Sequence, residues 1–220
     1  MFVGHYGPAF AAKSLARSVP LWTLFLAVQL VDVAWGVFVA NGIEHVRIIP
    51  GFTDSNSLDL YDMPLTHSLP AALAWAVGAG LVYAIWAPRE KRRGGAVIAL
   101  AVFSHWIMDL LVHVPDLALW PGGPKVGLGL WNNYPLALAL EFSLLFAGFA
   151  LYLRVTRAKN LVGRIWPWIF FFLLIAAEQV NHSMPLPDSI AQAGYMATAT
   201  FILITALAAI CDITRKPADS

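Results

Sequence analysis

Six long apolar stretches constrain this chain more than any other feature. Each approaches the roughly 20 residues that a helix needs to cross a hydrocarbon core about 30 Å thick. Because lipid cannot hydrogen-bond the backbone, such stretches cross a membrane as helices. The sequence therefore predicts one all-α integral membrane domain over residues 1–220, a polytopic transmembrane bundle of about six spans, with a short N-terminal half-helix within 1–19. The spans are expected near 20–40, 65–86, 95–114, 134–153, 165–182 and 190–211.

The composition agrees with a membrane location and excludes several other classes of protein. Hydrophobic residues make up 59% of the chain and charged residues 12%, whereas a water-soluble domain carries about 25% charged residues. The 14 Lys and Arg nearly cancel the 13 Asp and Glu, so the chain has no excess of positive charge for a nucleic acid. The single Cys211 excludes a disulfide framework and a cysteine-rich metal site.

The charge of the connecting loops predicts the orientation in the membrane. The loops after the second and the fourth stretch are rich in Arg and Lys, whereas the loop after the first stretch is acidic. Positively charged loops stay on the cytoplasmic side. With six spans, both termini are then expected to be cytoplasmic.

Ionisable side chains inside these stretches are candidate functional groups. An Asp, Lys or Arg costs at least about 2.5–3.5 kcal/mol at the centre of a membrane helix. A rise of about 1.5 Å per residue from the predicted cytoplasmic ends places the whole group in the middle and outer part of the membrane. His5 reaches a similar depth if residues 4–18 form a half-helix. The other members are Asp32, His67, His105, Asp109, His113, Glu141, Glu178 and His182.

The stretch near 95–114 carries the pattern that favours a metal site. His105, Asp109 and His113 are spaced by four residues, so their side chains form a stripe on one face of a helix. A helical pair at this spacing can bind one divalent cation. Imidazole and carboxylate ligands favour zinc, with manganese or iron as alternatives. A buried polar clamp between helices is the alternative for His105 and Asp109. The predicted metal ligands are His5, Asp32, His67, His105 and Asp109.

Four short segments resemble a bacterial family of predicted membrane-bound, metal-dependent hydrolases. Gly4 and His5 resemble its N-terminal Gly-His, and Leu-Val-Asp at 30–32 resembles the first Asp of its Leu-Pro-Asp-Ile-Asp-His motif. Leu-Thr-His-Ser-Leu at 65–69 resembles its Thr-His-Ser-Leu segment, and 104–109 resembles its Ser-His-x3-Asp element. The four segments follow the family's order and approximate spacing over the first half of the chain.

The resemblance implies a hydrolase in the inner membrane of a bacterium. The family is distantly similar to zinc-dependent phospholipases C and single-strand nucleases, whose His-x3-Asp ligands serve phosphodiester hydrolysis. This chain departs from the family at Ala34 and Trp35, where the family has Asp and His, and at 62–64, where Asp-Met-Pro replaces His-Arg-Gly. Asp62 is a candidate substitute for one missing ligand, and one metal ion or two are expected.

Two functions are the main alternatives for this polar layer. In the first, an ion with one open position hydrolyses a lipid-like phosphodiester or ester in the outer half of the bilayer, and Asp62 or His113 accepts the proton of the attacking water. Its partners are membrane lipid and a lipid-like or small-molecule substrate, with a homo-oligomer or larger membrane complex left open. In the second, the polar layer conducts protons or metal ions, which makes better use of Glu178 and His182. A haem or redox subunit and a non-catalytic subunit of a membrane complex are the further alternatives.

Overall fold

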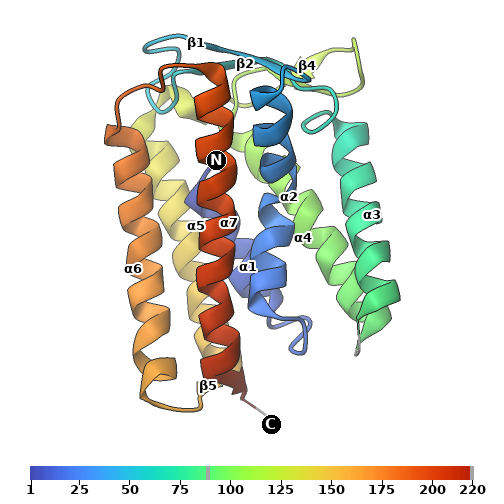
Figure 1. The fold of residues 1–220 in the computed structure, drawn as a ribbon, viewed down its shortest axis with the longest axis vertical. Coiled ribbons are helices and arrows are strands. Elements are labelled where there is room, and N and C mark those ends of the chain that lie inside the picture. The colour runs from blue at the N-terminus through green and yellow to red at the C-terminus, as the bar shows by residue number, and fades with distance from the viewer. Residues whose placement is uncertain (88–89, 219–220) are drawn as a thin grey trace.

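The computed structural model describes residues 1–87 and 90–218. Within these ranges, six helices are long and apolar enough to cross a membrane, which confirms the predicted helical bundle. Figure 1 shows the helices side by side, with the C-terminus at one end of the bundle. They are α2 (Leu21–Ala40), α3 (Leu69–Trp86), α4 (Lys91–Val112), α5 (Tyr134–Val155), α6 (Leu161–Ser183) and α7 (Ile190–Thr214).

Short elements complete the fold. The predicted N-terminal half-helix consists of η1 (Val3–His5) and α1 (Tyr6–Ala12), and η2 (Leu130–Asn132) precedes α5. Strands β1, β2 and β4 lie at the end of the bundle away from the C-terminus (Figure 1). The antiparallel strand pairs are β1 (His45–Ile48) with β2 (Leu58–Asp62), β3 (Leu117–Ala118) with β4 (Lys125–Val126), and β5 (Thr156–Ala158) with β6 (Arg215–Pro217).

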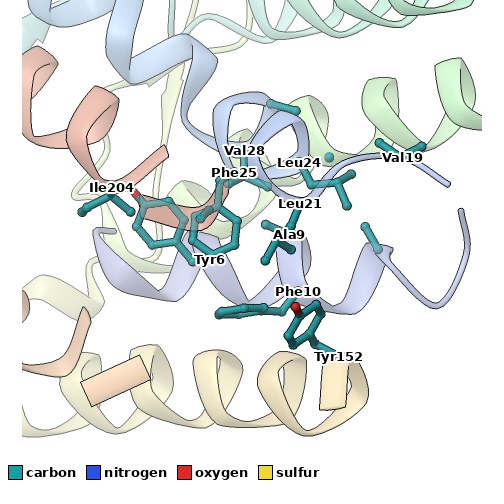
Figure 2. Packing of buried hydrophobic residues seen from close by; sticks show 14 of the residues in the cluster. Tyr6, Ala9, Phe10, Val19, Leu21, Leu24, Phe25, Val28, Tyr152 and Ile204 are labelled. Carbon is teal, nitrogen blue, oxygen red and sulfur yellow. The ribbon is translucent and has the colours of Figure 1, made fainter. Parts of the chain in front are cut away.

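Helix α1 is buried inside the bundle between α2 and α5 (Figure 2). The ring of Phe10 lies 4.9 Å from that of Phe25 on α2 and 5.3 Å from that of Tyr152 on α5, centroid to centroid. Gly7 and Gly148 allow α1 to approach α5 closely, since a Cβ added at Gly148 would lie 2.0 Å from the carbonyl oxygen of Gly7. A half-helix at membrane depth is tolerated when protein covers it. This packing fixes the position of η1, which leads into α1.

The chain turns from α1 into α2 through a set of backbone contacts. Lys13 donates from Nζ to the carbonyl oxygens of Arg17 and Val19. Asp212 on α7 accepts from the backbone N–H groups at the start of α2, which have no partners within the helix. The start of α2 is thereby held beside the end of α7.

Two histidines lie outside the spans in which the sequence analysis placed them. Helix α3 begins at Leu69 rather than near residue 65, because the Ser68 side chain accepts from the N–H of Ala71 and ends the preceding connection. His67 therefore belongs to the connection before α3. Helix α4 ends at Val112 rather than near residue 114, so His113 directly follows it.

Candidate metal centre

All five predicted metal ligands lie in one buried group around Asp109. The carboxylate oxygens of Asp109 lie 3.1 Å from Nε2 of His5, 3.0 Å from Nε2 of His105 and 3.5 Å from Nε2 of His113. The Asp32 carboxylate lies 3.4 Å from Nε2 of His105 and 3.3 Å from Nε2 of His67. We call this group the His–Asp cluster; it comprises His5, Asp32, His67, His105, Asp109 and His113.

Several elements build the His–Asp cluster. Helix α4 supplies His105 and Asp109 one turn apart, with His113 just beyond its end, whereas Asp32 comes from α2. His5 ends η1, and its ring stacks on that of His105 with centroids 3.9 Å apart. The side chains of the cluster are at most 4% exposed, except that of Asp32, which is 14% exposed. Burying so many ionisable groups is costly unless they pair or bind a metal ion.

Two imidazoles of the cluster, those of His105 and His113, form hydrogen bonds through Nδ1 to groups outside the cluster, and these bonds direct Nε2 into the cluster. Nδ1 of His105 lies 2.7 Å from the carbonyl oxygen of Val28, and Nδ1 of His113 lies 2.8 Å from Oδ1 of Asp116. Both partners are acceptors, so both Nδ1 atoms carry a proton. In the neutral imidazole, Nε2 then keeps its lone pair for the cluster.

His67 is oriented through Thr66 and Glu44. Thr66 Oγ1 donates its single proton to Oε2 of Glu44 over 2.6 Å, so it accepts from Nδ1 of His67, which is 2.7 Å away. Glu44 is buried and also accepts from the backbone N–H groups of Leu65 and Thr66. In the neutral imidazole, Nε2 of His67 then keeps its lone pair, and it lies 3.3 Å from the Asp32 carboxylate.

Removing the Thr66 hydroxyl tests this orientation. We expect Thr66→Val to weaken metal binding about 10–100-fold, the usual cost of losing a partner that orients a metal-binding histidine. Chelator-competition titration of the purified protein measures the effect. The matched control is Thr205→Val, since the Thr205 hydroxyl is buried without a hydrogen-bond partner among the described residues. Equal affinities for the two variants would contradict the role of Thr66.

The environment of His5 favours a neutral imidazole. Burial and the neighbouring imidazole of His105 lower the pKa of His5 to about 3. His113 behaves in the opposite way: burial opposes its charge, but the carboxylates of Asp109 and Asp116 raise its pKa above the usual value.

Glu141, which the sequence analysis singled out without a role, holds η1 in place. Its carboxylate on α5 accepts from the backbone N–H groups of Phe2 at 3.0 Å and Gly4 at 2.9 Å. The amino group of Met1 lies 2.9 Å from Oδ1 of Asp109. These contacts place His5, which follows Gly4, at the His–Asp cluster.

Three other residues from the sequence analysis lie apart from the cluster. Asp62 is the cross-strand partner of His45, and its half-exposed carboxylate accepts from Nδ1 of that residue at 2.9 Å. Among the described residues, no hydrogen bond or ion pair joins Asp62 to the cluster, which gives no support to its predicted role as proton acceptor. His182 is exposed and stacks on Tyr134, and Glu178 is buried on α6.

The donor set fits a divalent metal ion. Two overlapping sets, His5 with His105 and Asp109, and Asp32 with His67 and His105, each bring their donor atoms within 4.8 Å of one another. Nε2 of His105 has carboxylate oxygens of Asp32 and Asp109 within 3.4 Å, yet it forms no hydrogen bond of suitable geometry to a described residue. Such convergence is expected of ligands that share one ion, and imidazole with carboxylate suits zinc, manganese or iron.

Comparisons with protein-family models, curated proteins and solved structures find no match to this chain. The family resemblance therefore stays a prediction.

Proposed function

We propose that the His–Asp cluster binds a divalent metal ion, with zinc as the first candidate, and that the protein is a membrane-embedded hydrolase of lipid-like phosphodiesters or esters. One observation carries the metal: the imidazoles of His67 and His105 are each held at Nδ1 by a partner outside the cluster, and each directs Nε2 to the carboxylates of Asp32 and Asp109. Metal-binding histidines have outer partners of this kind. A polar clamp between helices would instead use each Nε2 in a well-formed hydrogen bond.

The chemistry follows from the positions of the residues. When bound, the ion would activate a water molecule and polarise the scissile phosphoryl or acyl oxygen. We assign proton acceptance to His113, whose Nε2 lies farther from Asp109 than those of His5 and His105. Asp116 accepts from its Nδ1 and would stabilise the imidazolium that forms. Asp32, the most exposed carboxylate of the cluster, is where we expect substrate or water to arrive.

Two arguments favour hydrolysis over transport of protons or metal ions. The segments that resemble the hydrolase family supply most of the cluster, including His5, Asp32 and Asp109. From η1 the chain continues into α1, whose buried Phe10 packs against Phe25 and Tyr152. A path for protons or metal ions that continued from the cluster past α1 would need polar groups in place of these aromatic rings.

The loop charges support an orientation with both termini in the cytoplasm, and the family resemblance implies the inner membrane of a bacterium. The cluster then lies in the middle and outer part of the bilayer, because α2 starts beside the end of α7 and Asp32 lies eleven residues, or about 16 Å, along α2 from Leu21.

A hydrolysis assay tests the proposed function. The purified protein is loaded with zinc, manganese or iron(II) in lipid bilayers and incubated with phospholipid and with acyl-ester lipid. We expect product formation that stops on chelation, returns when metal is added and is lost in His113→Gln with its metal content retained. Absence of turnover with every metal, or metal-driven uptake into sealed vesicles, would contradict a hydrolase.

A further inference from the structure

An apolar groove runs along α3 on the side that faces α2. It has a volume of about 410 Å³, which is within the range of about 300–1,000 Å³ usual for ligand pockets. Gly78 leaves it open, since a Cβ added there would meet no atom within 4 Å. Its walls include Leu30, Leu65, Ala71, Trp75, Gly78 and Val82.

The groove opens towards lipid. The neighbouring α3 side chains Val77, Leu81 and Ile85 are each more than half exposed and would lie in the hydrocarbon core of a membrane. The one polar group among the named walls is the Trp75 indole, and its N–H is already used by the carbonyl oxygen of Leu65 at 2.9 Å. The groove thus offers hydrocarbon contacts without a free donor, which selects an apolar occupant.

The length of the groove matches one leaflet. Ala71 and Val82 are eleven residues apart, which corresponds to about 16 Å along the helix, or about half of a hydrocarbon core of roughly 30 Å. Because α3 crosses the membrane, an occupant of this groove lies along the bilayer normal, as an acyl chain does.

The groove also lies next to the His–Asp cluster. Leu65 lines the groove two residues before His67, and Nε2 of His67 lies 3.3 Å from the Asp32 carboxylate. A lipid whose chain fills the groove would therefore hold its polar end near His67 and Asp32. Asp32 is also the most exposed carboxylate of the cluster.

From this juxtaposition we infer that the α2–α3 groove binds one acyl chain of a membrane lipid and presents the lipid's ester or phosphodiester to the His–Asp cluster. The role of the bound lipid as a substrate rests on the proposed function, whereas the binding of its acyl chain in the groove does not. It assigns the substrate class: a lipid recognised through one hydrocarbon chain.

Photolabelling in bilayers tests the groove without requiring turnover. The probe is phosphatidylglycerol with a photoreactive diazirine in one acyl chain, present as a small fraction of the lipid, and the labelled residues are mapped by mass spectrometry. We expect labelling to concentrate on residues 71–82 relative to the lipid-facing parts of α5 and α6. Gly78→Leu fills open space and should reduce the labelling of residues 71–82 to the level of the lipid-facing parts of α5 and α6. The matched control is Ala139→Leu, which adds the same side chain at an exposed position of α5.

The outcomes separate the groove from the proposed function. Selective labelling that Gly78→Leu removes, with metal content unchanged, supports the groove; if hydrolysis is also absent, only the catalytic role of the site is overturned. Uniform labelling of all lipid-facing helices, or unchanged labelling in Gly78→Leu, would overturn the groove even in an active enzyme. Photo-crosslinks between two copies through the groove would overturn it in favour of a dimer interface.

Discussion

Asp109→Asn is expected to abolish stoichiometric metal binding. The Asp109 carboxylate lies within 3.5 Å of three imidazoles, and the substitution keeps its shape while replacing one anionic oxygen by an NH2 group that cannot bind a cation. Loss of an outer partner weakens metal binding about 10–100-fold, so loss of this central ligand should exceed that range. Elemental mass spectrometry after dialysis measures the bound metal.

Asp59→Asn is the control for this experiment. Asp59 lies on β2 and forms an ion pair of 3.6 Å with an exposed Arg47, the kind of pair that is worth about 0–1 kcal/mol. This variant should bind as much metal as the unmodified protein. Full metal content in Asp109→Asn would remove Asp109 from the ligand set, and similar losses in both variants would point to a non-specific effect of charge.

Gly148→Ala is expected to destabilise the bundle and to weaken the metal site with it. The added Cβ would lie 2.0 Å from the carbonyl oxygen of Gly7, and a backbone atom cannot avoid it by a change of rotamer. Overpacking in a core costs about 1–3 kcal/mol, occasionally more, and here α1 must move away from α5. Because His5 directly precedes α1, we expect both a lower thermal unfolding temperature and a lower metal affinity.

Gly78→Ala separates this packing effect from helix propensity. The same change at Gly78 meets open space, and Ala is favoured over Gly in a helix by about 1 kcal/mol. The unfolding temperature of Gly78→Ala should therefore stay the same or rise. An unfolding temperature for Gly148→Ala equal to that of the unmodified protein would show that α1 does not pack on α5 as described.

The membrane helices were predictable because lipid imposes a strong and simple rule on apolar length. The half-helix was predictable for a related reason, since the polar groups of 13–17 end an apolar segment too short to cross. The exact start of α3 was not, because it depends on Ser68 as a cap and not on hydropathy. His67 consequently lies in a connection, where it is free to turn towards α2.

The candidate site was predictable as far as depth and helical spacing define it. His105 and Asp109 lie one turn apart on α4. The rise of about 1.5 Å per residue along the predicted helices also predicted similar membrane depths for Asp32 and His5. Glu44 was missed, because its link to His67 runs through Thr66 and forms only when the loop before α3 folds back. Asp116 was also missed, because the predicted stripe ended at His113. Its spacing of three residues from His113 is nevertheless a usable signal.

Asp62 was predicted to have a role at the site, yet it lies apart from the His–Asp cluster. It was assigned from its place in the chain, next to the segment that resembles the family. The register of the β1–β2 hairpin sets Asp62 opposite His45, and a register of this kind follows from the loop geometry rather than from a sequence motif. The side chain is then used within the hairpin.

The most direct test of the account is X-ray absorption spectroscopy of the zinc-loaded protein in lipid. The His–Asp cluster predicts nitrogen and oxygen ligands at about 2.0–2.1 Å, with the multiple scattering of several imidazoles and without sulfur. Failure of the protein to retain stoichiometric zinc, or a sulfur ligand at about 2.3 Å that places the ion at Cys211 instead, would contradict the assignment of the cluster as a metal centre.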